Sequence, residues 1–403
     1  MKELIFNILG IISLLGVFYL MSNDKKSINV KLIVKALLLQ LLFTYFIVKV
    51  PVGIQMITAL SDVVSNALGH GTEGLRFVFG NLTNDQSIFI VNSLSGIIFV
   101  ATLIGVLNHF GIIELIVTIL GGGLSKLLGV EKNESMVAVS NIFLGQTEAP
   151  LLLGKEKLSS MTESQLFLVL VSGMGSVSAS ILLAYASISD VVTMTNLVIG
   201  CSLVPLSSII ISKLFFPETN TEIIKNDESI KESLRLKKSD KDLMVCISDS
   251  YMNAGNMVLA IVFSLIAIIS LVSLANGILG MIGISLEGVA SFIFKPLVLL
   301  MGATGDANLV MSELLATKVI SNEFVAFGSL ASNHAVLNNR LITMSTIMLL
   351  GFANISSIGI TLSGVGTLIP DKKDTLAKLC PKAMVAGFAV SVLSSLIVGL
   401  FVQ

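Results

Sequence analysis

Charged residues are scarce in this sequence, since Asp, Glu, Lys and Arg together make up 13% of its 403 residues. Soluble domains usually carry about 25%. Apolar residues account for 54% and the mean hydropathy is +0.93, which indicates a polytopic membrane protein. The formal net charge of −1 offers no broad attraction for nucleic acid, so nucleic acid is not expected as a partner.

Cysteine, tryptophan and histidine are also rare or absent. The three cysteines, Cys201, Cys246 and Cys380, match no metal or redox spacing and are interpreted as small apolar side chains. Tryptophan is missing, so any aromatic belt at the membrane surface must use Tyr and Phe. His70 and His109 lie at the ends of predicted elements and are expected to be solvated, whereas His334 is left open as a proton carrier.

Long apolar runs are abundant. A bilayer is crossed by about 20 apolar residues. The first run is longer than a signal-peptide core and no small-x-small cleavage site follows it, so it is predicted to be a transmembrane helix. A further stretch, 52–68, has apolar residues at helical spacing and is predicted to lie in the membrane interface. Eight predicted spans follow from the runs 4–21, 32–50, 88–108, 164–186, 191–215, 253–279, 341–366 and 382–402.

The distribution of lysine and arginine predicts the orientation. All the lysine-rich connections can be cytoplasmic at once if the N-terminus is outside. This requires 133–153 to enter and leave the membrane from the cytoplasmic side, and 306–332 to do so from outside. Both segments are therefore predicted to be re-entrant hairpins. The stretch 217–244 mixes both signs of charge and is expected to be a solvated cytoplasmic linker.

The same unit occurs twice along the chain. Each copy has a hairpin with a glutamate at its tip, then a span interrupted by small and polar residues, then a plain span. The interruptions are SGMGSVSAS (172–180) and GFANISSIG (351–359). The predicted fold class is thus an all-α polytopic membrane protein with eight transmembrane helices and two opposed re-entrant hairpins, related as an inverted repeat. In such transporters the substrate lies at the repeat interface, where helices are discontinuous.

The first hairpin places a carboxylate at membrane depth, in NIFLGQTEAPLLL (141–153). Burying Glu148 in lipid costs about 3 kcal/mol, so it must face an interior partner. That partner is either a polar guest or a cation of the bundle, such as Lys318 or Arg340. A neutral guest with hydroxyls and amide edges would suit the groups present, because an amide and a hydroxyl can each donate and accept.

Three motifs carry a family resemblance. GQTEAP (145–150), NEFVAF (322–327) and GFANISSIGI (351–360) resemble, in order and spacing, the signature motifs of the concentrative nucleoside transporters, and the resemblance covers nearly the whole chain. It implies a nucleoside:cation symporter rather than an enzyme, without an enzyme cofactor, in the bacterial cytoplasmic membrane. It also implies a homotrimer whose inner transport domain slides against a trimeric scaffold, the elevator mechanism.

The resemblance also implies a substrate site. The tip of the first hairpin would address the nucleobase, an apolar residue would pack against the base, and the second repeat would hold the ribose hydroxyls. The residues implied are Gln146, Thr147 and Glu148 for the base edge, Ile181 for packing, and Glu323, Asn354 and Ser357 for the ribose.

A sodium site is implied in the same way. It would use the side chains of Asn141 and Ser176 with the carbonyls of Leu144 and Val177. Oxygen ligands of this kind suit a hard cation. Sodium is favoured over protons as the coupling ion, but titration of a buried carboxyl group is kept as the alternative.

The predicted domains follow the same division. Spans 1–3 and span 6 form the scaffold, and the two repeats form the transport domain. The boundaries are 1–110 (scaffold with interfacial helix 52–68), 111–216 (interfacial helix, first hairpin, spans 4–5), 217–244 (linker), 245–301 (span 6 and interfacial helix) and 302–403 (second hairpin, spans 7–8).

Two places depart from the family pattern. Residues 301–306 read MGATGD with no tryptophan, and LNNR (337–340) stands where an acidic–basic pair is expected. The preference for purine or pyrimidine bases is therefore left open. A carrier of another polar solute, a membrane-embedded enzyme and a channel remain as alternatives; a carboxylate solute would call for an arginine, for which Arg340 is the candidate.

Overall fold

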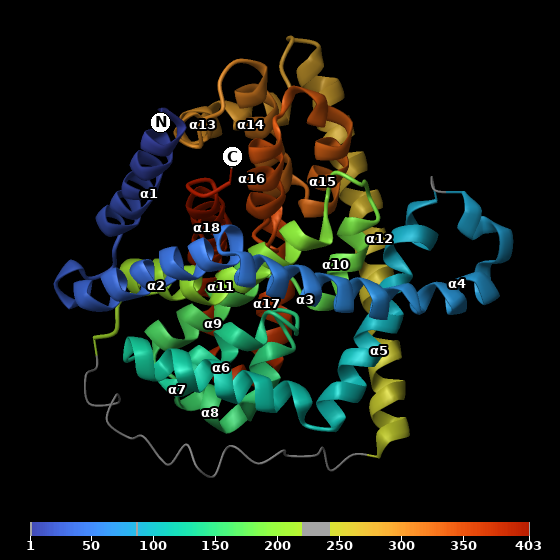
Figure 1. Ribbon diagram of the computed structural model, residues 1–403, viewed down its shortest axis with the longest axis horizontal. Coiled ribbons are helices and arrows are strands. Elements are labelled where there is room, and N and C mark those ends of the chain that lie inside the picture. Colours follow the sequence, from blue (N-terminus) through green and yellow to red (C-terminus); the bar gives the residue numbers. More distant parts are fainter. Residues whose placement is uncertain (1, 86–87, 220–241, 403) are drawn as a thin grey trace.

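The computed structural model describes residues 2–85, 88–219 and 242–402. Most of the predicted linker 217–244 lies outside these ranges. The described chain is built from helices and their connections, without strands (Figure 1). In chain order the α-helices are α1 Lys2–Leu20, α2 Val30–Lys49, α3 Pro51–Gly69, α4 Gly71–Phe79, α5 Gly96–His109, α6 Ile112–Leu128, α7 Lys132–Ser140, α8 Gly154–Ser160, α9 Glu163–Gly175, α10 Ala179–Ala186, α11 Met194–Phe215, α12 Leu243–Gly280, α13 Leu286–Leu300, α14 Asp306–Ile320, α15 Glu323–Asn333, α16 Asn339–Leu349, α17 Ile355–Leu368 and α18 Lys373–Val398.

The predicted spans reappear as helical stretches, two of which are divided by a break. Among the described residues, seven helical stretches are long and apolar enough to cross a membrane, and one of them, Glu163–Ala186, includes the break between α9 and α10. The seventh predicted span, 341–366, is split into α16 and α17, neither of which is long enough alone. The segment 52–68 falls within α3, and the interfacial helices predicted in 111–216 and 245–301 fall at α6 and α13.

Two helices are interrupted where small and polar residues cluster. Between α9 and α10 the backbone is extended at Ser176 and Ser178. Between α16 and α17 it passes through Gly351, whose φ of +97° favours glycine, and restarts at Asn354, which caps α17. The interruptions predicted at 172–180 and 351–359 contain these breaks. Each break frees carbonyls at the end of one helix and amides at the start of the next.

Two helix pairs lie at the predicted hairpins. The first helix pair is α7 and α8, joined through turns and a 3-10 segment, Ala149–Leu152, that contains Pro150. The predicted hairpin 133–153 covers α7 and this connection, whereas α8 begins after it. The second helix pair is α14 and α15, joined at Ser321 and Asn322. Figure 1 shows α7 and α8 at the lower end of the molecule and α14 and α15 at the upper end. Their re-entrant passage and their relation as an inverted repeat remain predictions.

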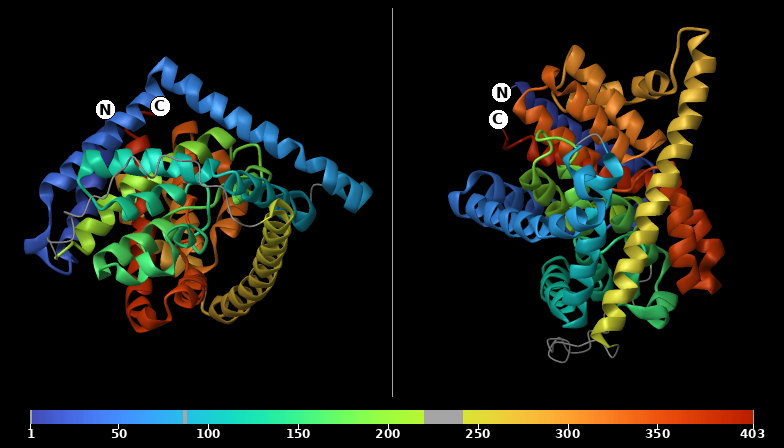
Figure 2. Two further views of the ribbon diagram at one scale, coloured as in Figure 1. Left: turned by 90° about the horizontal axis from the view of Figure 1, so that it is seen from below. Right: turned by 90° about the vertical axis from the view of Figure 1, so that its right-hand side faces the viewer.

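The core is formed by the helices that follow each pair. In the most apolar part of α11, 94% of the residues are buried, against 11% for α12. Both views in Figure 2 show α12 as a long helix along one side of the molecule, and it packs mainly against α5. The apolar side chains that α12 exposes, such as Phe263 and Ile266, therefore face lipid or another protein surface.

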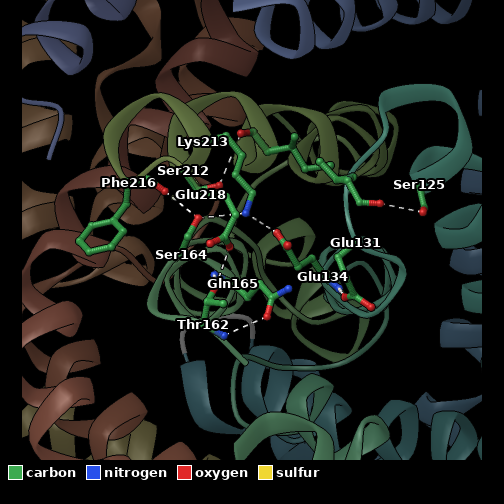
Figure 3. A network of polar contacts seen from close by, with 12 residues as sticks. Ser125, Glu131, Glu134, Thr162, Ser164, Gln165, Ser212, Lys213, Phe216 and Glu218 are labelled. Carbon is green, nitrogen blue, oxygen red and sulfur yellow. Dashed lines mark hydrogen bonds and ion pairs between the residues drawn. The ribbon is translucent and has the colours of Figure 1, made fainter. Parts of the chain in front are cut away.

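A buried ion pair anchors the first helix pair to the core (Figure 3). Nζ of Lys213, near the end of α11, lies 2.6 Å from Oε2 of Glu134 in α7, and both side chains are buried. Lys213 also donates to Oγ of Ser164 at 3.1 Å, at the start of α9. Thr162, which precedes α9, donates to Glu218 at 2.6 Å. Three helices are thus joined at the base of the first helix pair.

Breaking this ion pair is expected to destabilise the protein strongly. Lys213→Met leaves the Glu134 carboxylate buried without its cation, which costs about 3–5 kcal/mol. Replacing both residues with methionine removes both buried charges and should recover most of that loss. The measurement is the thermal unfolding of purified wild-type, single and double variants in detergent. Equal and additive losses would show that the two side chains do not act as a pair.

Candidate functional site

One cavity of about 600 Å³ lies where the tip of the first helix pair meets α10, α12, α15 and α17. Its volume is in the range typical of small-molecule sites. The side chains of all the residues predicted to bind substrate line it, namely Gln146, Thr147, Glu148, Ile181, Glu323, Asn354 and Ser357. The fold therefore brings together groups that are more than 200 residues apart in the sequence.

Glu323 is the buried carboxylate of this cavity. It occupies the first position of α15, where the positive end of the helix dipole favours an anion. Its side chain accepts hydrogen bonds from the Tyr185 hydroxyl at 3.0 Å and from Nδ2 of Asn354 at 3.1 Å, one on each oxygen. A carboxylate oxygen has a further lone pair, so Glu323 can still accept two hydrogen bonds from a guest.

Asn354 joins Glu323 to the start of α17. Its Oδ1 accepts from the backbone N–H of Ser357 at 3.0 Å, from the Ser357 hydroxyl at 3.0 Å and from the Ser356 hydroxyl at 2.7 Å. Only one Nδ2–H is left for a ligand. The side chain thus positions the carboxylate and the helix N-terminus, and its capacity for a guest is a single donor.

The tip of the first helix pair closes another side of the cavity. Oε1 of Gln146 accepts a hydrogen bond from the Thr361 hydroxyl of α17 at 3.1 Å, which leaves the amide nitrogen of Gln146 as donor. Thr147 packs so closely on Gly364 that an added Cβ there would lie 2.3 Å from Cγ2 of Thr147. Glu148 is exposed into the cavity and accepts from the backbone N–H of Gly145 at 3.3 Å.

The ion-pair interpretation of Glu148 finds no support in the described residues. Lys318 donates to carbonyls of another helix, and Arg340 lies near Glu3. Arg340 also donates to the carbonyls of Met301 and Gly399, each at 3.2 Å, so the two places where the sequence departs from the family pattern contact each other. This leaves Arg340 outside the cavity lining, where it cannot meet a carboxylate solute.

Apolar side chains form the remaining walls. Ile181 of α10 is buried, and the cavity is also bordered by Phe324, Phe352 and Ile360. Flat apolar and aromatic surfaces of this kind can hold a planar ring, while the few convergent polar groups fix its orientation.

Several residues of the site were not predicted from the sequence. Tyr185 and Thr361 hold Glu323 and Gln146, respectively. Asn253 and Asn256 of α12 also line the cavity. The only signal for the last two was MNAGN (252–256), an unusually polar stretch at the edge of a predicted span.

The residues predicted to bind sodium lie beside the cavity, where α7 and α9 end. Asn141 is fully buried, its Nδ2 donates to the Val137 carbonyl at 3.0 Å and to Ser172 Oγ at 2.9 Å, and its Oδ1 has no hydrogen-bond partner. A buried acceptor without a partner is costly. A cation bound beside it would satisfy that acceptor, so this oxygen suits a hard cation.

The two helix breaks meet at this point. The backbone N–H of Phe352 donates to the Ser176 carbonyl at 3.3 Å. A Cβ on Gly351 would lie 2.8 Å from the Gly175 carbonyl oxygen, so no larger residue fits without displacement. Ser176 belongs to the predicted cation set and Phe352 borders the cavity, so the backbones of the two places are in direct contact.

The structure places two of the histidines discussed above. His109 is buried and contacts Cys246 Sγ at 3.6 Å, so the expectation that it is solvated was wrong; it ends α5 and contacts α12. His334 begins a 3-10 turn after α15, with Nδ1 2.7 Å from the Ala331 carbonyl. Among the described residues no group of three or more His, Cys, Asp or Glu side chains is placed to hold a metal ion.

Comparison with known proteins connects this geometry to a family. Residues 9–82 and 196–399 match the models described as the N-terminus and C-terminus of the Na+ dependent nucleoside transporter, and residues 90–191 match the model described as nucleoside recognition. An uncharacterized transporter of Haemophilus influenzae is 35% identical over 98% of this chain and 97% of its own length. The nucleoside permease NupC of Helicobacter pylori is 32% identical, with 99% and 98% covered.

Solved structures of CNTnw have a similar fold. CNTnw in an inward-facing, substrate-bound state has a TM-score of 0.91 at 30% identity, covering 99% of this chain and 98% of that chain. A variant of CNTnw in an outward-facing state has a TM-score of 0.90 at 28% identity, covering 100% and 98%.

Proposed function

The chain belongs to the Na+ dependent nucleoside transporter family, and we propose that it imports nucleosides together with a coupling cation, for which sodium is favoured over the proton. The observation that carries the proposal is the cavity that joins Glu323 and Asn354 to the tip residues Gln146 and Thr147. It offers a carboxylate for hydroxyl groups at one side and an amide with a hydroxyl at the other.

A nucleoside matches this distribution of groups. Its ribose hydroxyls are donors that the free lone pairs of Glu323 can accept, and hydrogen bonds to a charged group are about twice as strong as neutral ones. Its base presents donors and acceptors to Gln146, Thr147 and Glu148 and a flat face to Ile181. Both purine and pyrimidine bases offer such an edge, so these residues alone set no preference.

Sodium is proposed as the coupling ion because of the unpaired Oδ1 of Asn141. Ser176 and the carbonyls of Leu144 and Val177 would complete the oxygen set. The contact between Ser176 and Phe352 gives a physical route by which the bound cation would hold the second helix break in its binding position. Uptake would then follow the inward sodium gradient.

Alternating access is proposed to be of the elevator type. The cavity lies between the tips and broken helices on one side and α12 on the other. Movement of 111–216 with 302–403 past 1–110 and 245–301 would carry the cavity across the membrane. The low burial of α12 and the structures of CNTnw in inward-facing and outward-facing states support this division. The exposed face of α12 also supports assembly with further copies of the chain. We propose that the assembly is a homotrimer with its N-termini outside.

The test is uptake of radiolabelled uridine and guanosine into proteoliposomes under an imposed sodium gradient and, separately, a proton gradient. Accumulation driven by sodium, and lost when the gradient is collapsed with an ionophore, is the expected result. Protein-free liposomes under the same gradients are the control.

The other outcomes have definite meanings. Accumulation driven only by protons would retain nucleoside transport and reject the sodium site. No accumulation of either nucleoside under either gradient would reject nucleosides as the substrate of this cavity.

A further inference from the structure

Lys318 is a completely buried lysine that the nucleoside site does not use. It lies in the last turn of α14 with none of its surface exposed. Its Nζ donates to the carbonyls of Met348 at 2.8 Å and Leu350 at 2.7 Å, and to Oγ of Ser391 at 2.8 Å. No carboxylate of the described residues lies within ion-pair distance of this nitrogen.

The hydrogen bonds suit the charged form of this group. The Ser391 hydroxyl lies 3.0 Å from the Phe388 carbonyl, and when it donates to that carbonyl it accepts from Lys318. In this arrangement all three partners of Nζ are acceptors, and an ammonium has the three N–H groups that they need, whereas a neutral amine has two. The Phe388 ring, 5.7 Å from Nζ, adds a favourable cation–π contact to the ammonium.

The place of this ammonium is at the end of α16. The carbonyls of Met348 and Leu350 stand at the helix C-terminus, where they lack partners along the helix and where the helix dipole favours a cation. Gly351, which follows Leu350, packs on Gly175 at the other helix break. Lys318 thus binds the end of α16 directly beside the contact between the two helix breaks.

The predicted sodium residues occupy the corresponding place in the other half of the chain. Asn141 follows α7, the first helix of the first pair, and Ser176 follows α9, the first part of the first broken helix. Lys318 lies in the last turn of the first helix of the second pair, and Leu350 follows the first part of the second broken helix. The position in the first half has the buried Oδ1 of Asn141, which has no hydrogen-bond partner. The position in the second half has the ammonium group of Lys318, a cation that belongs to the chain itself.

We propose that the Lys318 ammonium is a built-in cation that takes, in the second half of the chain, the place that a free cation takes in the first. Its role is to position the second break, and through it the Asn354 cap and Glu323, so that this half needs no ion from solution. Removing the side chain leaves three acceptors around a hole, which becomes a binding site for a small cation. The comparison between the two halves of the chain rests on the proposed sodium site. The position of the Lys318 ammonium, and the hole that its removal would leave, do not depend on that site.

The first test measures stability and needs no transport. Lys318→Ala is expected to unfold at a lower temperature than the wild type in N-methyl-D-glucamine chloride, whose cation is too large for the hole. Methylammonium or sodium chloride at the same ionic strength should restore much of the loss. The wild type, whose hole is filled, should show no such response to methylammonium.

A matched control removes a different buried lysine. In Glu134→Met/Lys213→Met an ammonium is lost together with its carboxylate, so of the two acceptors described above only the Ser164 hydroxyl remains, against three around the hole left by Lys318. This double variant should show no selective response to methylammonium. An equal response in both variants, or a Lys318→Ala response that is the same in all three salts, would overturn the proposal.

A second variant covers the case in which the alanine protein does not fold. Lys318→Gln is one atom shorter than lysine, but it fills most of the hole, keeps two N–H donors and removes the charge. It should be less stable than the wild type and be partly restored by sodium. Wild-type stability of Lys318→Gln would show that the charge is not needed and would overturn the proposal.

The second test measures transport. The sodium dependence of uridine uptake should become steeper, with a Hill coefficient of about 2 in Lys318→Ala against about 1 in the wild type, because a second cation must bind. Uptake by the wild type establishes the proposed function independently. If the wild type transports uridine and the variant binds a cation without a steeper dependence, the built-in cation does not act on transport and the positioning role is wrong.

Discussion

Glu323→Gln is expected to reduce kcat/KM for uridine uptake by about 100-fold or more. The substitution keeps the size of the side chain but removes its negative charge and replaces one acceptor oxygen with an N–H donor. Tyr185 and Asn354 each donate to one of the two carboxylate oxygens in the wild type, so the new amide nitrogen faces a donor. Two hydrogen bonds from ribose hydroxyls to a charged partner contribute about 1.5–3 kcal/mol each, and 1.4 kcal/mol is a factor of ten.

The same variant should lose its discrimination against sugars without hydroxyls. The wild type is expected to prefer uridine to 2′,3′-dideoxyuridine, because the dideoxy sugar offers no hydroxyl donors to the remaining lone pairs of the buried carboxylate. In Glu323→Gln the two substrates should compete almost equally in uptake assays. Tyr185→Phe is the graded control: it removes one supporting bond and keeps the carboxylate, so its loss should be smaller and its discrimination retained. Full discrimination in Glu323→Gln would place the ribose elsewhere.

Most residues of this site that were predicted from the sequence lie at the ends of helices. Glu323 and Asn354 follow residues that stop one helix and begin another, so their position was visible as a polar interruption in an apolar run. Tyr185 gave no such signal, because an aromatic residue inside an apolar helix is usually packing. Its role depends on α10 facing α15, and that contact is set by tertiary packing alone.

Lys318 shows a different limit. From the sequence alone, Lys318 is an alternative ion-pair partner of Glu148, but its nitrogen donates to backbone carbonyls more than 25 residues away in sequence. Carbonyl oxygens have no signature in a sequence, since every residue has one. Sites built on helix termini of broken helices are therefore recognised only when the fold is known.

Asn141→Leu is expected to raise the sodium concentration that half-activates uptake by at least about tenfold, because it removes an oxygen ligand worth at least about 1.4 kcal/mol to the cation. Leucine has a similar size, so the packing of α7 on α9 is largely kept. The measurement is uridine uptake at varied sodium concentrations and saturating uridine. The maximal rate at high sodium should fall less than the apparent sodium affinity.

The chain offers a matched control in Asn7. This asparagine of α1 is also fully buried, its Nδ2 donates to the Leu396 carbonyl at 3.3 Å, and its Oδ1 likewise has no partner. Asn7→Leu therefore makes the same chemical change at a place with no predicted cation ligands. It should alter stability without altering the sodium dependence. If both variants shift the sodium dependence alike, the unpaired oxygen of Asn141 is a feature of packing; if only Asn141→Leu does, the cation binds where α7 and α9 end.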